Sequence, residues 1–200
     1  IFEISELIRD YIDISFNNDY LCNAKWVTTI ATLLDENGTV FTYGSPVSNT
    51  YLAVEGYGFF EDSANPELSR NALITANTIY LPENSEGKLP IFAEGVGKVI
   101  IDSATTQITD TGDSTQKIQY VTIPANSSTI QVYDTDDATL KKTINVINVC
   151  EPKYTPLKVT FVNKYGAFQD QYFFKKSTES FQVTDETYKR NTIDVSTATY

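Results

Sequence analysis

The chain has 200 residues with 15 basic and 26 acidic side chains, no histidine and a net charge of -11. Such a surface repels phosphate backbones, so we expect no nucleic-acid partner. The lack of histidine excludes Ser-His-Asp triads, Cys-His pairs and histidine-based metal sites within these residues. No apolar run approaches the ~18 residues that span a bilayer, so we also expect no membrane insertion.

The charge is distributed unevenly along the chain. Residues 1–150 carry 8 basic and 20 acidic side chains, a net of -12, whereas residues 151–200 carry 7 and 6, a net of +1. Two prolines, Pro152 and Pro156, lie where the composition changes. We therefore expect an N-terminal helix or arm over 1–23, an acidic β-sandwich over 24–150 and an aromatic hairpin or meander over 151–200. A single domain with one acidic face is the alternative.

The N-terminal stretch "EISELIRDYIDI" has apolar residues at helical spacing: Ile4, Leu7, Ile8, Tyr11 and Ile12. This stripe predicts a short amphipathic helix, although its β-branched residues leave an extended arm as the competing interpretation. An isolated helix of under ~12–15 residues is marginal in water, so packing must hold it. The support is either the chain's own sandwich or a neighbouring subunit, and we favour the neighbour.

From residue 24 the pattern becomes that of short strands separated by turn residues. The stretch "AKWVTTIATLL" predicts a strand, Asn37-Gly38 a tight hairpin turn with positive φ angles, and "TVFTY" and "TYLAVEGYGFF" further strands. Asn65 and Pro66 suit the start of one helical turn. Six more strands are predicted in "NTIYLP", "LPIFAEG", "GKVIIDS", "QKIQYVTIP", "STIQVYD" and "KKTINVINVC", and a polar loop in "TTQITDTGDSTQ". This spacing predicts a mainly β protein, an antiparallel β-sandwich of immunoglobulin-like or related type.

The stretch "VTFVNKYGAFQDQYFFKK" predicts a β-hairpin with its turn at "NKYGAF". Three aromatic residues, Phe161, Phe173 and Phe181, suit one face of the resulting sheet. We expect them to form the core of this region. The stretches "SFQV" and "TYKRNTIDV" are expected to continue the meander.

Few residues here suggest reactive chemistry. The aspartates of "DTGD" (Asp110, Asp113) and "DTDD" (Asp134, Asp136, Asp137) could bind calcium, but neither run matches the twelve-residue calcium loop, and solvated turn aspartates are the favoured interpretation. A glycan hydrolase with two paired carboxylates stays open, because sequence spacing does not give their separation in space. We therefore expect no catalytic residue, no metal and no cofactor.

The two cysteines, Cys22 and Cys150, flank the acidic segment. They could pair across a sandwich, which would indicate an oxidising compartment. Two buried thiols are the favoured interpretation.

Four stretches together resemble β-rich tail-associated structural proteins of tailed bacteriophages. They are "FEISELIRDYIDISFNNDY", "IQYVTIP", "KYTPLKVTFVNKYGAFQDQYFFKKS" and "ETYKRN", and the resemblance is strongest over 152–191. It implies a structural role in the virion, in many copies per particle, with other virion proteins and copies of itself as partners. It also implies a C-terminal sheet that continues beyond Tyr200.

The resemblance and the aromatic content together predict a non-enzymatic assembly protein, because such proteins need exposed sheet edges and aromatic patches. A carbohydrate- or receptor-binding β-sandwich that contacts a host surface glycan is the alternative. The expected assembly interface combines the N-terminal stripe with aromatic residues of the C-terminal hairpin. Its residues are Ile4, Leu7, Ile8, Tyr11, Tyr165, Phe168, Tyr172 and Phe174.

Overall fold

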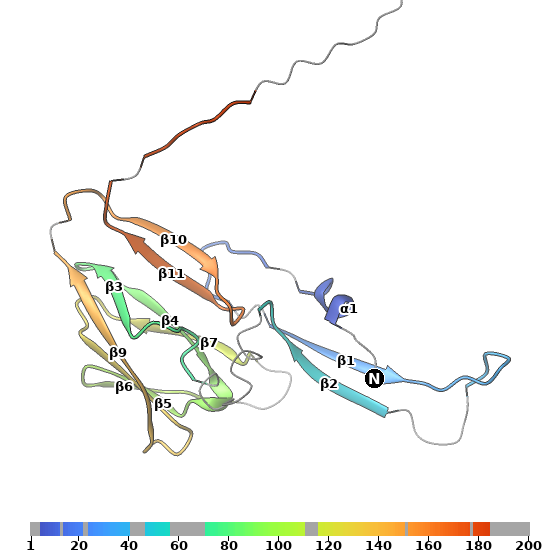
Figure 1. The fold of residues 1–200 in the computed structure, drawn as a ribbon. Helices are drawn as coiled ribbons and strands as arrows, with labels where there is room; N and C mark the ends of the chain where they lie inside the picture. Colours follow the sequence, from blue (N-terminus) through green and yellow to red (C-terminus); the bar gives the residue numbers. More distant parts are fainter. Residues whose placement is uncertain are drawn as a thin grey trace, which may run out of the picture.

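The computed structural model describes residues 5–12, 14–21, 24–40, 47–56, 71–110, 116–150, 152–176 and 178–184. These residues form a mainly β protein with several separate sheets and one short helix, α1, at Ser5–Arg9. Figure 1 shows a two-layer body made from the middle of the chain, with two-stranded elements from its beginning and its end beside it. The expected mainly β class is confirmed.

The larger layer of the body is a five-stranded sheet with the order β3-β9-β8-β5-β6. Its strands are β3 (Thr78–Pro82), β5 (Lys98–Ile101), β6 (Ala104–Gln107), β8 (Thr129–Tyr133) and β9 (Leu140–Val149). Neighbours run antiparallel except β3 and β9, which are parallel. The sheet therefore joins the first and last of these strands side by side.

The smaller layer pairs β4 (Gly87–Phe92) with β7 (Ile118–Ile123), and the 3-10 helix η1 (Ala93–Gly95) follows β4. Alternate residues of both layers point into one apolar cluster, as the period of a β-strand requires. The cluster includes Leu89, Val99, Ile123, Ile130 and Val132, each with no exposed surface. This cluster is the core that holds the two layers together.

Before the body, β1 (Lys25–Ala31) and β2 (Val47–Ala53) pair antiparallel and form a ribbon of their own. These strands lie within the range expected for the sandwich but hydrogen-bond to each other. Between them Asp35 pairs with Thr39 around a turn. Gly38 has a φ of 79° there, but Asn37 does not have a positive φ, so the expected turn geometry is corrected to a three-residue loop with one left-handed glycine.

After the body, β10 (Leu157–Val162) and β11 (Phe168–Phe173) form the C-terminal hairpin. Its turn contains Gly166 at a φ of 75°, and a side chain there would meet the backbone oxygen of Glu55 at 2.7 Å. The turn therefore packs against the backbone that follows β2. A second cluster, Leu73, Phe92, Ile118, Tyr165 and Ala167, joins this turn to the body, and Leu52 and Val54 pack on it.

Three expectations for particular segments need correction. The segment expected as a polar loop begins inside β6, because Ala104–Gln107 pairs with β5 through a tight turn at Asp102, which has a φ of 53°. The stretch "SFQV" at 180–183 is exposed and lies outside any strand. Phe161, Phe173 and Phe181 are exposed, so the prediction that they form a core is wrong.

Other expectations fall partly outside the described residues. Cys150 is exposed, which contradicts its expected burial, and Cys22 lies outside the described residues. The expected helical turn at Asn65 and Pro66 and the whole of "TYKRNTIDV", residues 187–195, also lie outside them. Within the described part of the chain, no helix has the length and apolar character needed to cross a membrane.

Candidate functional site

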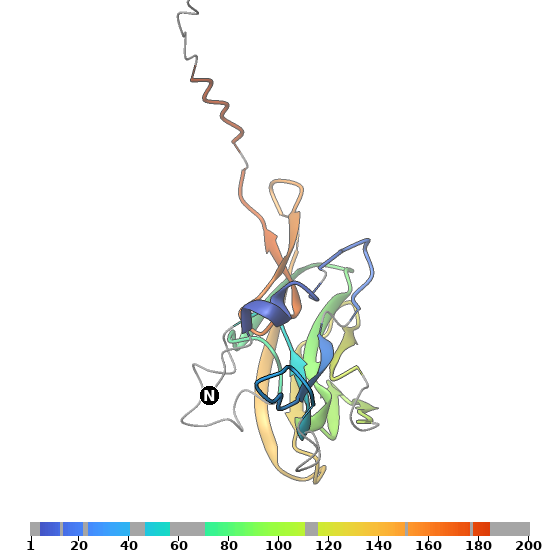
Figure 2. The ribbon, with the colours of Figure 1, turned by 90° about the vertical axis from the view of Figure 1, so that its right-hand side faces the viewer.

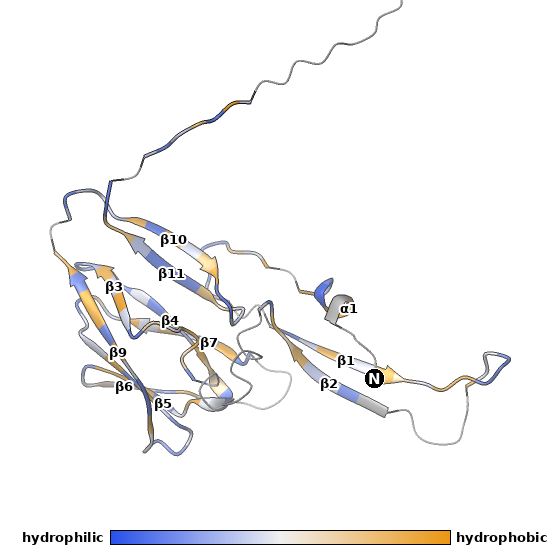
Figure 3. Cartoon of the chain, in the orientation of Figure 1, coloured by the Kyte–Doolittle hydropathy of each residue, from blue (hydrophilic) through white to orange (hydrophobic). Residues whose placement is uncertain are grey.

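The two faces of the C-terminal hairpin differ in their surroundings. Register pairs Leu157 with Phe173, Val159 with Gln171 and Phe161 with Gln169, and opposed residues of an antiparallel pair share a face. We call this set the outer face; its members are Leu157, Val159, Phe161, Gln169, Gln171 and Phe173. The alternate residues, among them Lys158, Thr160 and Asp170, form the inner face. Hydrophobic and hydrophilic residues alternate along β10 accordingly (Figure 3).

Four apolar side chains of the outer face are exposed to solvent. The exposed fractions are 55% for Leu157, 39% for Val159, 41% for Phe161 and 53% for Phe173. Contiguous apolar surface of this kind, unlike single exposed apolar residues, marks sites of interaction. The outer face is therefore the candidate functional site of the described chain.

The inner face of the hairpin is covered by the N-terminal segment. The Tyr20 hydroxyl donates a hydrogen bond to Asp170 Oδ2 at 2.5 Å, and Lys158 Nζ donates to the Tyr20 oxygen at 2.9 Å. Thr160 donates to the other carboxylate oxygen of Asp170 at 2.7 Å, and the Asp170 side chain is almost fully buried. A buried carboxylate requires such partners. This cluster fixes the N-terminal segment on the hairpin.

Aromatic packing extends the same contact. The Phe16 ring lies 4.8 Å from the ring of Phe168 and 5.3 Å from that of Tyr20, measured between centroids. The Tyr20 ring also lies 5.5 Å from that of Tyr120 on β7. These separations are typical of favourable aromatic pairs. The N-terminal segment thus links the hairpin to the body.

The cluster changes the titration of its members. Burial, and then the hydrogen bond to Asp170, raise the pKa of Tyr20 above its usual value. The hydrogen bond to Tyr20 and the charge of Asp170 raise the pKa of Lys158. Burial raises the pKa of Tyr172 as well. At neutral pH the tyrosines of the cluster are therefore neutral and the lysine is charged. We call the hydrogen-bonded group of Tyr20, Lys158, Thr160 and Asp170 the clasp.

The aromatic residues expected at the assembly interface lie in different environments. Tyr165 and Phe168 are buried within this chain, so neither offers surface to a neighbour, and their expected place on the interface is corrected. They are buried because the hairpin turn packs on the body and Phe16 covers Phe168. Tyr172 and Phe174 are half-buried, with their rings stacked at 6.4 Å.

The N-terminal stripe is described only in part. Leu7 and Tyr11 are about 70% exposed, at 69% and 70%, and Ile8 is half-buried. Ile4 lies outside the described residues. Leu7 and Tyr11 therefore do not pack on the described part of their own chain.

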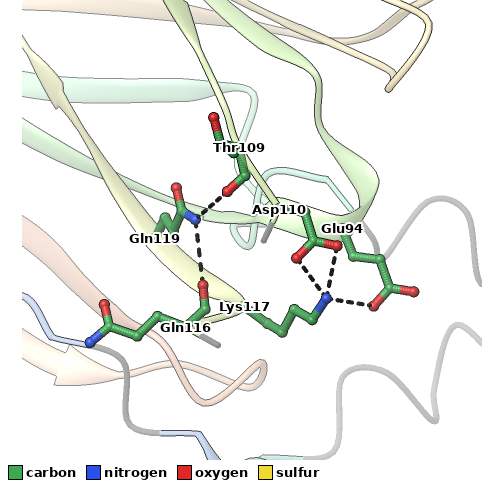
Figure 4. Close-up of polar contacts among 6 residues, drawn as sticks. All are labelled: Glu94, Thr109, Asp110, Gln116, Lys117 and Gln119. Atoms are coloured by element: carbon green, nitrogen blue, oxygen red, sulfur yellow. Dashed lines mark hydrogen bonds and ion pairs between the residues drawn. The ribbon is translucent and has the colours of Figure 1, made fainter. Parts of the chain in front are cut away.

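A buried ion pair lies directly before β7. Lys117, whose side chain is 2% exposed, contacts both carboxylate oxygens of Asp110 at 2.6 and 2.8 Å (Figure 4). The Glu94 carboxylate lies 3.8 Å from the same nitrogen. Nearby, Gln119 donates to the backbone oxygens of Thr109 and Gln116. Asp110 is thus bonded to a lysine, which disfavours its expected alternative use as a calcium ligand.

The second aspartate run forms a turn between β8 and β9. Asp136 accepts hydrogen bonds from the side chain and backbone of Thr139 and from the backbone of Ala138, and these bonds lower its pKa to about 2. The pKa of Asp134 is lowered first by its bond to Lys141. Among the described residues, no group of three or more potential ligands is arranged to hold a metal ion; Asp113 lies outside them.

Sequence reasoning missed the residues that determine which hairpin face is exposed. These residues are Phe16 and Tyr20, and Tyr20 lies 150 residues before Asp170, the residue to which it donates a hydrogen bond. The one sequence signal was the placement of Lys158, Thr160 and Asp170 on a single face of the predicted hairpin. Because another segment of the chain covers this inner face and bonds its polar groups, the outer face is left exposed to solvent.

The comparisons with known proteins add no relative to this geometry. No protein-family model matches the chain, and neither a curated protein nor a solved structure matches it.

Proposed function

We propose that this protein is a non-enzymatic structural subunit of a tailed-bacteriophage virion, associated with the tail. It acts through contacts with other virion proteins and with copies of itself. The observation that carries the assembly role is the exposed apolar outer face of the hairpin. The resemblance of residues 152–191 to tail-associated proteins supports the place in the particle.

The outer face offers a substantial driving force for association. Full burial of an aliphatic or aromatic side chain contributes roughly 1.5–3 kcal/mol. The four apolar residues are about half exposed, so covering each of them adds about 1 kcal/mol. The clasp on the inner face holds the hairpin in place before any partner arrives, which reduces the ordering cost of association.

The composition of the outer face favours a protein partner over a glycan. Its six residues include two glutamines and no carboxylate. Asp170 lies on the inner face and is bonded there to Tyr20 and Thr160. A flat apolar sheet face suits another protein chain, whereas a glycan site needs an aromatic residue beside polar groups in a cleft.

We also propose that the body is an immunoglobulin-like β-sandwich. Two features support this assignment. The seven strands of the body divide into two layers: one contains β3, β5, β6, β8 and β9, and the other contains β4 and β7. In variable-type immunoglobulin sandwiches, the sheet with strands C, F and G is likewise extended by C′ beside C. Here β5, β8 and β9 correspond to C, F and G, β6 to C′, and β4 and β7 to B and E.

Analytical ultracentrifugation tests the assembly role. We expect the purified chain to form species larger than its 22.4 kDa monomer as its concentration rises. Replacing Phe161 and Phe173 with threonine, which retains strand propensity, should raise the dissociation constant at least about tenfold, the effect of about 1.4 kcal/mol. Tyr51→Thr changes an exposed aromatic residue on β2, outside the hairpin, and should have no such effect.

A wild-type chain that stays monomeric at every concentration would contradict self-association. For the place in the particle, an antibody against the body should label the tails of virions purified from the phage that encodes this protein. Label on the heads, or absence of the chain from purified particles, would contradict the tail assignment.

A further inference from the structure

The residues after the hairpin form an extended arm with an unusual side-chain pattern. We define the arm as residues 178–184, with the sequence TESFQVT. Phe181 and Val183 are 90% and 86% exposed and, two residues apart, lie on the same side of an extended chain. In two perpendicular views the arm leads away from the body (Figures 1 and 2). It has the pattern of a β-strand without a neighbouring strand.

The arm is poorly placed to pair with its own hairpin. The linking residues 174–177, FKKS, contain no glycine, proline, asparagine or aspartate, and Ser177 is their one common turn former. The edge of β11 that faces away from β10 lies beside β3 and β4 (Figure 1), and residues of these strands line a small cavity of about 40 Å³ together with Gln169–Gln171. A third strand of a simple meander would need that edge.

The strand β10 offers the matching surface. Among the described strands its hydrogen-bonded neighbour is β11, so its other edge carries backbone groups available to an added strand. Leu157, Val159 and Phe161 form an exposed apolar row at the same two-residue period as the arm. By contrast, β6 at the edge of the large sheet presents Ala-Thr-Thr-Gln, a mainly polar exposed row.

Two observations favour an arm that docks on a second copy of the chain. The arm leads away from its own body (Figures 1 and 2). Residues 151–200, which include both the arm and β10, carry a net charge of +1, whereas the first 150 residues carry -12, so two copies approach each other with the least repulsion through this part of the chain. Because donor and acceptor surfaces differ, the contact is heterologous and can repeat from copy to copy.

We propose that the arm of one copy adds as a strand to the free edge of β10 in a second copy, with Phe181 and Val183 on the outer face. This mode of association is β-augmentation, in which main-chain hydrogen bonds give affinity and alternate side chains give specificity. The inference rests on the proposed assembly role and names its partner and its contact.

Disulfide trapping between two kinds of chain tests the contact. In a Cys22→Ser, Cys150→Ser background, a chain with Val183→Cys is mixed with a differently tagged chain that carries Val159→Cys, or Leu157→Cys or Phe161→Cys to cover shifts of register. We expect a mixed disulfide dimer from at least one of these pairs. Gln182→Cys, on the opposite side of the arm, and Thr105→Cys, on β6, are the matched controls and should cross-link far less.

Sedimentation provides the second readout. Phe181→Ser with Val183→Ser should raise the dissociation constant at least about tenfold, the effect of about 1.4 kcal/mol, without lowering the melting temperature, because both side chains are exposed. Gln182→Ser with Thr184→Ser should leave association unchanged.

Different failures separate the two proposals. Oligomers that form without cross-links above the controls would overturn the arm contact and leave the assembly role intact. A Val159→Cys, Val183→Cys chain that cross-links within itself, as a monomer, would show that the arm folds back and would also overturn it. A chain that forms no oligomers overturns self-association and the arm contact together.

Discussion

The body and the C-terminal hairpin are built from similar residues but bury them differently. In the body, alternate residues of two layers meet in one core, and Val132 there has no exposed surface. In the hairpin, Val159 has the same side chain in the same secondary structure, yet it faces solvent. The apolar residues of the body thus stabilise the fold, whereas those of the outer face leave apolar surface in contact with solvent, which is why we propose that a partner covers them.

The two regions also differ in how they hold their polar groups. The body encloses the Lys117 side chain, whose charge is paired with the partly exposed carboxylate of Asp110. The hairpin directs its polar groups inward, to the clasp with Tyr20. Successive side chains of a strand point to opposite faces, so the polar residues that face the clasp alternate with apolar residues that face solvent.

The largest expected effect concerns the buried lysine of the body. Asp110→Asn leaves the Lys117 ammonium buried with the Glu94 carboxylate at 3.8 Å as its remaining charged neighbour in this cluster. Loss of one partner of a buried pair is strongly destabilising, so we expect the free energy of unfolding to fall by about 3 kcal/mol. Lys117→Met should cost less, because Asp110, with a side chain 28% exposed, can reach water. Urea unfolding of both variants checks the order, and a larger loss for Lys117→Met would contradict this account.

A matched truncation compares the two regions directly. Val132→Ala removes two buried methyl groups and leaves a cavity, which should lower the free energy of unfolding by about 2 kcal/mol. Val159→Ala removes the same atoms from the exposed outer face and should cost less than about 1 kcal/mol in the monomer. Equal losses, measured by chemical denaturation at low protein concentration, would show that the outer face is covered within a single chain.

The smallest effect concerns the clasp. Tyr20→Phe removes one hydrogen bond to Asp170, which retains Thr160 as a donor, so we expect a loss of about 1 kcal/mol at neutral pH. The raised pKa of Tyr20 means that the folded state holds this proton more tightly than the unfolded state. The contribution of Tyr20 is therefore complete below about pH 10 and is lost as the pH rises through the folded-state pKa.

Thermal unfolding between neutral and alkaline pH checks this dependence. Wild type should lose stability at alkaline pH more steeply than Tyr20→Phe, with Tyr80→Phe as a control at an exposed tyrosine on β3. Identical slopes for wild type and Tyr20→Phe would mean that the clasp does not depend on the Tyr20 proton.

Local patterns predicted most strands of the body. Strands such as β4, β7 and β8 combine β-branched residues with flanking turn residues, and they lie where the sequence placed them. The strand β6 was missed because Ala104–Gln107 is polar and exposed on both sides, so it has no alternation to detect. It forms because the turn at Asp102 returns the chain along β5, and Asp102 fixes that turn by bonds to Ser128 and Thr129.

The exposed face of the hairpin was beyond local reasoning. Aromatic content alone favoured a core for Phe161 and Phe173, and hydropathy cannot say which side of a two-stranded element is covered. The outcome depends on Phe16 and Tyr20, which reach the inner face from the far end of the sequence. Contacts of that separation leave no periodic signal within either segment.

The parallel pairing of β3 with β9 bears on how the body folds. Thr78 lies beside Asn145, so this part of the sheet requires a long loop to close, while β8 and β9 need just a short turn. Loop closure between distant segments slows folding relative to local hairpins. During synthesis β3 must therefore wait, unpaired, until β9 has emerged, and in refolding experiments amide protection of Ile79 and Leu81 should appear after that of the β8–β9 hairpin.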